Sequence, residues 1–123
     1  MPLRITADAA GHFWTDADID GAHISRVLID TGATFVVLSS RDAAAAGVTP
    51  EPSEFTHTIS TANGMARVAR MKLGYVRVGD LTIRDVDALV AQKGAMGNSL
   101  LGMSFLSKLS RFTVESGTLT LRK

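Results

Sequence analysis

The chain has 123 residues, no cysteine and a formal net charge of +1, from 13 basic and 12 acidic side chains. This length is enough for one self-sufficient core, so we expect a single domain over residues 1–123. The lack of cysteine excludes disulfides, thiolate metal sites and a cysteine nucleophile. The balanced charge argues against nucleic acid as a partner, and no apolar run approaches the roughly 20 residues that cross a bilayer, so we expect no direct membrane insertion.

The chain opens with two predicted strands around a tight turn. Segments 13–19 and 22–29 flank Asp20-Gly21, a pair suited to the two positive-φ positions of a short hairpin. The second strand becomes continuously apolar at its end, which is typical of a strand covered on both faces. It leads directly into Asp30-Thr31-Gly32-Ala33-Thr34, and apolar residues resume at 35–38.

A short helix and a long hairpin are expected next. Ser39 is the predicted N-cap of the helix, Asp42 its capping-box partner and Gly47 its C-terminal stop. The hairpin is indicated by two alternating segments around Asn63-Gly64, the strongest short hairpin signal in the chain. Its strands are expected over residues 55–60 and 66–78.

The last third of the chain is predicted to hold short strands around one flexible loop at 92–98, where two glycines occur. Residues 104–109 are expected to form a second short helix. The expected strands cover residues 81–86, 88–90, 99–102, 111–115 and 118–122. The chain is therefore predicted to be mostly β, with one or two short helices.

Asp30 is the oddest local feature, because it ends an apolar strand inside an otherwise apolar region. A carboxylate in such a place must be hydrogen-bonded, paired or protonated, since unpaired burial is costly. Gly32 can bring a backbone N–H close to the carboxylate, and the Thr31 hydroxyl can lock the turn. The local pattern alone also allows an aspartate that only caps a turn through its own backbone.

The segment Ile29-Asp30-Thr31-Gly32-Ala33-Thr34 resembles the active-site loop of pepsin-like and retropepsin-like aspartic proteases. Apolar runs flank the triplet, as that family requires. A hairpin tipped by Asn63-Gly64 follows where the family carries its flap. Leu100-Leu101-Gly102 before a short helix is similar to the family's element of two hydrophobic residues and a glycine. The resemblance covers roughly residues 11–121 and is strongest to bacterial single-domain retropepsin-like enzymes.

This resemblance implies a single-domain retropepsin-like fold, a closed β-barrel with a flap hairpin. It implies an aspartic endopeptidase without metal or other cofactor, in which Asp30 is catalytic and Thr31 and Gly32 hold it. A peptide substrate would bind as an extended strand. The residues expected to contact it lie in the catalytic loop, the flap and the hydrophobic-glycine element: Leu28, Ala33, Thr34, Phe35, Ala62, Asn63, Gly64, Met65 and Leu100.

The family's mechanism needs two carboxylates, whereas this chain has one Asp-Thr-Gly. The resemblance therefore implies a homodimer in which each subunit supplies one Asp30 on a two-fold axis. Terminal strands, including residues 118–122, are the expected interface. The chain departs from the retroviral pattern at Thr34 and Met103, where those enzymes carry an acidic residue and an arginine. Both members of that ion pair are missing together.

Two other interpretations stay open. One is a non-catalytic retropepsin-fold domain used for dimerisation or peptide binding, and the other is an unrelated small β-barrel with a chance Asp-Thr-Gly. Three histidines lack metal-ligand spacing and an acidic cluster beside them, so we expect ordinary surface or strand residues: His12, His23 and His57. Arg70, Lys72 and nearby Arg84 are predicted to form a solvated strand face, with an acidic partner as the alternative. Trp14 is predicted to anchor the core.

The sequence leaves the location of the protein unknown. The first residues lack the apolar segment of a signal peptide. Bacterial members of the family are often tethered to a membrane with this domain outside the cytoplasmic membrane. The resemblance therefore implies a domain that is periplasmic or tethered as part of a longer precursor.

Overall fold

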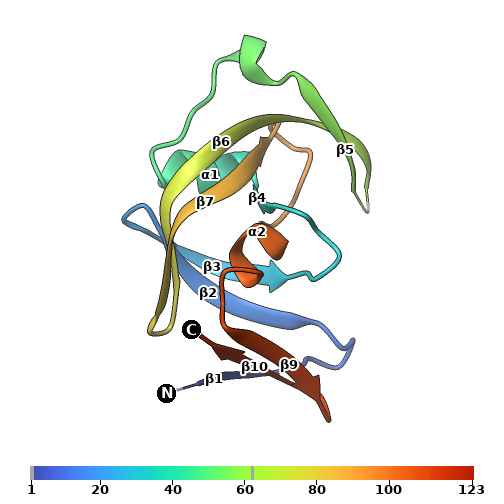
Figure 1. The fold of residues 1–123 in the computed structure, drawn as a ribbon. Coiled ribbons are helices and arrows are strands. Elements are labelled where there is room, and N and C mark those ends of the chain that lie inside the picture. The colour runs from blue at the N-terminus through green and yellow to red at the C-terminus, as the bar shows by residue number, and fades with distance from the viewer. Residues whose placement is uncertain (1, 62) are drawn as a thin grey trace.

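The computed structural model describes residues 2–61 and 63–123 (Figure 1). Two short α-helices, α1 (Ser40–Ala45) and α2 (Met103–Leu106), and one 3₁₀ turn, η1 (Pro52–Glu54), accompany the strands. The strands in chain order are β1 (Leu3–Thr6), β2 (Phe13–Ile19), β3 (Ala22–Ile29), β4 (Val36–Leu38), β5 (His57–Thr61), β6 (Gly64–Val78), β7 (Leu81–Ala91), β8 (Leu100–Leu101), β9 (Arg111–Glu115) and β10 (Thr118–Arg122). The predicted mostly β architecture is confirmed.

The strands form two sheets. The smaller has the order β1-β10-β9, and the larger has the order β2-β3-β8-β4-β7-β6-β5. Strand β2 also pairs with β6, through Asp18↔Arg77 and Ile19↔Val76, so the larger sheet closes on itself. The result is a closed ring of strands, from which the β5–β6 hairpin extends as a long curved arm (Figure 1).

The hydrophobic core has two parts, which lie on opposite faces of β4. Val36 and Leu38 point into the main core, while Val37 packs in a smaller cluster with Val68 and Leu89. Alternation of side chains along a strand produces this division, and all three residues of β4 are buried. The continuous apolar run at 35–38 is therefore explained by a strand that is covered on both faces.

Two predicted hairpins are confirmed with their expected bounds. In the first, between β2 and β3, the turn residues Asp20 and Gly21 have φ values of 47° and 90°, as a two-residue hairpin requires. The second joins β9 to β10. These elements were predictable because turn chemistry and strand alternation are both local.

The prediction of two strands over 81–86 and 88–90 was wrong, because β7 is continuous and pairs with β6 along its length. Asp87 interrupts the apolar pattern, but its carboxylate lies 3.8 Å from the ammonium group of Lys72 on the neighbouring strand. Strand β7 therefore continues through the polar residue Asp87 because it pairs with β6 there. Strand β1 was not predicted from the sequence, and it is held by pairing with β10.

Trp14 does not anchor the core. Its neighbour Phe13 packs against the main cluster, whereas Trp14 is half-buried and has the guanidinium of Arg26 4.3 Å from its ring centroid. The indole N–H donates a 2.9 Å hydrogen bond to Asp8. Phe13 and Trp14 are successive residues of β2, so their side chains point to opposite faces of the sheet, and Phe13 takes the face toward the core.

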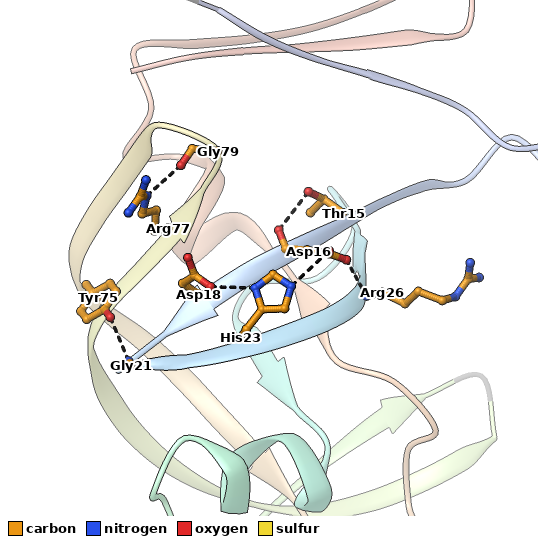
Figure 2. Close-up of polar contacts among 9 residues, drawn as sticks. All are labelled: Thr15, Asp16, Asp18, Gly21, His23, Arg26, Tyr75, Arg77 and Gly79. Carbon is orange, nitrogen blue, oxygen red and sulfur yellow. Dashed lines mark hydrogen bonds and ion pairs between the residues drawn. The ribbon is translucent and has the colours of Figure 1, made fainter.

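His23 lies between two carboxylates, contrary to the prediction that it has no acidic cluster beside it. Its Nδ1 is 2.9 Å from Asp18 and its Nε2 is 3.2 Å from Asp16, as Figure 2 shows. The hydrogen bonds to Asp18 and Asp16 raise the pKa of His23. Asp18 and His23 are cross-strand partners, and Asp16 occupies an irregularity in the β2–β3 register. Strand pairing therefore assembles a cluster that spacing along the chain does not reveal.

Among residues 2–61 and 63–123, the helices are too short or too polar to cross a bilayer.

Candidate active site

Asp30 is held by backbone groups at the point where β3 ends. Its own N–H donates a 3.0 Å hydrogen bond to the carbonyl of Leu101, and its carbonyl accepts one of 3.1 Å from the Ala33 N–H. The Gly32 N–H donates a 2.9 Å hydrogen bond to the Asp30 carboxylate, as expected. The half-buried Asp30 carboxylate therefore accepts a hydrogen bond from a residue two positions along the chain. The hydrogen bonds of the Asp30 N–H and carbonyl fix the backbone at this residue.

Of the two residues that follow Asp30, Gly32 contacts its carboxylate within one chain and Thr31 does not. A Cβ at position 32 would lie 3.2 Å from the Asp30 carboxylate, so glycine permits the close approach of its N–H. Thr31 is exposed, and its hydroxyl has no hydrogen-bond partner among the described residues. The turn is therefore not locked by Thr31 within a single chain, which corrects the expected role of that hydroxyl.

The hydrophobic-glycine element crosses directly behind the Asp30 loop. The N–H of Met103 donates a 2.7 Å hydrogen bond to the Ala33 carbonyl, and that of Ser104 donates a 2.9 Å bond to the Thr34 carbonyl. A Cβ on Gly102 would lie 2.3 Å from the Phe35 carbonyl oxygen, too close for any side chain. The two segments are therefore packed backbone against backbone, and each determines the position of the other.

Ser104 ties three elements together beneath the loop. Its hydroxyl accepts a 2.8 Å hydrogen bond from the Val36 N–H and donates one of 2.7 Å to the Asp87 carbonyl. It thereby links α2, β4 and β7 through a single oxygen atom. The sequence predicts only a helical position for Ser104, because a serine at a helix start carries no signal of a distant partner.

A buried hydroxyl, that of Ser99, joins helix α1 to β8. It accepts a 3.0 Å hydrogen bond from the Ser39 N–H and donates a 2.6 Å bond to the Asp42 carboxylate. Ser39 is the N-cap as predicted, with its hydroxyl 3.2 Å from the Asp42 N–H. The second half of the predicted capping box was wrong, since the Asp42 carboxylate bonds to Ser99 instead of the Ser39 N–H.

A cavity of about 520 Å³ opens beside Asp30. Eight residues expected at the catalytic or substrate site line it: Leu28, Asp30, Gly32, Ala33, Thr34, Phe35, Asn63 and Leu100. The cavity lining does not include Thr31, Gly64 or Met65. Met65 is 71% exposed near the tip of the β5–β6 hairpin, and the expected contact Ala62 lies outside the described residues.

Half of the residues that line this cavity were not among the predicted catalytic residues and substrate contacts. Val37 and Leu89 belong to the smaller core cluster, and Ile59 and Met96 pack against it, so this cluster forms an apolar part of the wall. The further lining residues are Ser60, Thr61, Gly97 and Asn98. A methionine inside the glycine-containing loop at 92–98 was the available signal, because an apolar side chain in a flexible loop needs a surface to cover.

The cavity is mainly apolar, with one carboxylate among its described lining residues, that of Asp30. At its border the guanidinium of Arg70 lies over the Phe35 ring, 5.1 Å from the ring centroid. Within residues 2–61 and 63–123, no three His, Cys, Asp or Glu side chains gather where they could hold a metal ion. The described part of the site therefore places a single carboxyl group beside a cavity that can hold apolar groups.

The sequence of residues 15–105 matches the family model described as aspartyl protease, and the chain belongs to that family. The fold is retropepsin-like. The structure superposes on a retropepsin-like aspartic protease from Rickettsia conorii with a TM-score of 0.85 and 29% identity, covering 98% of this chain and 89% of that one. The predicted resemblance to this family is confirmed.

Further similarities extend the comparison. The EIAV protease, solved in complex with the inhibitor HBY-793, shares the fold with a TM-score of 0.68 at 20% identity, covering 90% of this chain and 100% of that one. An uncharacterized Sinorhizobium protein is 44% identical over 112 residues, 91% of this chain and 48% of that protein. A Rickettsia prowazekii protein is 31% identical over 119 residues, which cover 97% of this chain and 50% of that protein. The chain spans about half the length of these curated relatives.

Proposed function

We propose that the chain is one half of a homodimeric aspartic endopeptidase, with Asp30 of each subunit supplying one catalytic carboxylate. The observation that carries this proposal is the position of Asp30, held by the Gly32 N–H at the wall of a 520 Å³ cavity. Membership of the aspartyl protease family supports peptide-bond hydrolysis as the reaction. The Asp-Thr-Gly triplet occurs once, so one chain supplies only one such acid.

Two carboxylates that share one proton divide the chemistry between them. The ionised group takes a proton from water as the water attacks the peptide carbonyl, and the protonated group donates to the carbonyl oxygen. The proton on the first group then reaches the leaving amine as the carbon–nitrogen bond breaks. A single Asp30 cannot hold both states at once, which is the physical reason for a second copy.

The cavity is suited to an extended peptide. Its apolar wall can receive alternate side chains, and exposed backbone along β5 and the Asp30 loop can pair with the peptide main chain. We assign substrate contact to the predicted lining residues and to the flap tip, Asn63, Gly64 and Met65. Closure of the flap over a peptide would explain why Met65 is 71% exposed in the free chain.

The proposed dimer interface must take account of how the terminal strands pair within one chain. Strand β10, expected at the interface, is central in its sheet and pairs with β1 on one side and β9 on the other. Its backbone therefore has no open edge for a second copy. The free edges belong to β1 and β9, and Val114 on β9 is 55% exposed. We propose that pairing between copies uses these edges and the exposed Thr31 loop.

The decisive test compares wild type with Asp30→Asn on an unstructured protein substrate between about pH 4 and 7. We expect cleavage by wild type, none by the variant, and unchanged sedimentation of both. Adding the variant to wild type should lower the activity per wild-type chain, because mixed dimers hold one acid only. If wild type sediments as a dimer and cuts nothing in this range, the chain is a peptide-binding or dimerisation domain of the same fold.

A further inference from the structure

Strand β6 carries four basic side chains, and three of them have partners among the described residues. The Arg67 guanidinium donates two hydrogen bonds to the Phe55 carbonyl, 3.1 and 2.8 Å long. The Arg77 Nε donates a 2.9 Å hydrogen bond to the Gly79 carbonyl, and Lys72 lies 3.8 Å from the Asp87 carboxylate. The exception is Arg70, which has no hydrogen-bond acceptor or carboxylate partner in the described part of the chain.

Arg70 projects from the face of the sheet that borders the cavity. It is directly opposite Leu89 in the β6–β7 register, and directly opposite residues share one face of a sheet. Leu89 lines the cavity. Arg70 is itself exposed, and its guanidinium lies 5.1 Å above the ring of Phe35, a second lining residue. The charge is therefore held at the cavity border by an aromatic ring.

Contact with Phe35 leaves the hydrogen-bonding capacity of Arg70 unused. The five N–H donors of a guanidinium lie in the plane of the group, and the contact with the ring face uses none of them. That geometry suits bidentate hydrogen bonds to a carboxylate. Asp30 is the one carboxylate among the described lining residues, so no second carboxylate of the cavity wall competes for the guanidinium.

We propose that Arg70 is a specificity-determining residue that selects a peptide with a carboxylate side chain over Phe35. This inference rests on the proposed function, since it assigns a substrate class to the same groove. A dimer has two such guanidinium groups, one from each subunit. The preference for glutamate or aspartate should therefore occur at equivalent distances on both sides of the cleaved bond.

The test uses a synthetic library of decapeptides in matched pairs, with glutamate or glutamine at each position in turn. Cleavage by wild type is quantified by mass spectrometry. The same library is also passed over immobilised Asp30→Asn protein to measure binding without turnover. We expect the glutamate member to be favoured about fivefold at one position on each side, since an exposed ion pair contributes up to about 1 kcal/mol.

Three variants identify the source of the preference. Arg70→Gln should abolish it, and Arg70→Glu should reverse it, so that the glutamine member of each pair is favoured. Lys72→Gln, which removes a charge from the same strand and face, should leave it intact. Equal loss in the Lys72 variant would overturn the proposal in favour of general electrostatic attraction.

The cleavage and binding measurements separate this inference from the proposed function. Cleavage without any preference for glutamate overturns the role of Arg70 alone. Binding with an Arg70-dependent preference, but without cleavage by wild type, supports the role of Arg70 and overturns the protease. A preference only for the terminal carboxylate of each peptide shows that the guanidinium reads a chain end, which overturns the side-chain assignment. If peptides are neither cut nor retained, both proposals are wrong.

Discussion

Gly102 lies so close to the carbonyl of Phe35 that a Cβ at this glycine would be 2.3 Å from the carbonyl oxygen. The loop that carries Asp30 and the element before α2 are therefore interlocked through their backbones. Hydrogen bonds from Met103 and Ser104 to the same loop complete the contact. The position of the acid thus depends on a segment far along the chain.

Replacing Gly102 with alanine should strongly destabilise the fold, because the clashing atoms are backbone and cannot move aside. Overpacking usually costs about 1–3 kcal/mol, and we expect a loss of at least about 3 kcal/mol in the free energy of unfolding. Urea denaturation measures this loss. The matched control is Gly97→Ala, since a Cβ there has no atom within 4 Å and should change stability little. Equal stability of the two variants would contradict the interlocked geometry.

Replacing Gly32 with alanine should lower activity while the fold is retained. The added Cβ would lie 3.2 Å from the Asp30 carboxylate, so the carboxylate must shift by a few tenths of an ångström. Catalysis is sensitive to such displacement, and we expect kcat to fall at least about tenfold. Steady-state kinetics together with urea denaturation separate this effect from unfolding. A variant with wild-type kcat would show that the Gly32 contact does not position the acid.

Replacing Ser99 with alanine should destabilise the protein, because two buried or half-buried groups lose their partner. The Ser39 N–H loses an acceptor and the Asp42 carboxylate loses a donor. Unsatisfied groups of this kind cost about 1–3 kcal/mol each, and we expect a loss of about 2 kcal/mol in the free energy of unfolding. The control is Ser25→Ala, at an exposed β3 position without a side-chain partner among the described residues. Similar denaturation midpoints for both variants would exclude the network as a source of stability.

His23 should stabilise the fold in acid more than in base. Hydrogen bonds to Asp18 and Asp16 raise its pKa, so its contribution is fully present below its unfolded pKa of about 6.5. The contribution is lost as the pH rises through the higher pKa of the folded state. His23→Gln should therefore lower the urea midpoint relative to wild type at about pH 5, and less at about pH 8.5. The control is His57→Gln, at an exposed strand position with no carboxylate partner among the described residues, and a His23 effect that grows with pH would contradict the ion pairs.

Much of the fold could be predicted from local sequence. Asp20-Gly21 specifies a tight turn through its positive φ angles, and Ser39 is recognisable as an N-cap because it bonds to a residue three positions away. The Asp-Thr-Gly triplet also indicated the cavity, since most of the residues expected around it do line the cavity. These features can be predicted because the residues that cause them lie within a few positions of one another.

Other features could not be predicted because their causes are distant in the chain. Ser99 and Ser104 bond to residues on other elements, and no spacing rule brings those partners together. His23 acquires two carboxylates only when β2 pairs with β3. Trp14 was assigned to the core, but the β2–β3 register places it outside. In each case strand register or the crossing of elements decides the neighbour.

The sequence by itself determined the strand pattern, the turns and the single Asp30 loop, because hydrophobic alternation, turn chemistry and a contiguous motif are properties of short segments. Only the tertiary structure decided what surrounds that loop. The closed ring of strands packs Gly102 behind Asp30, brings Leu89 and Met96 to the cavity wall and sets Arg70 over Phe35. These contacts join residues far apart in the chain, so they exist only once the ring of strands has closed.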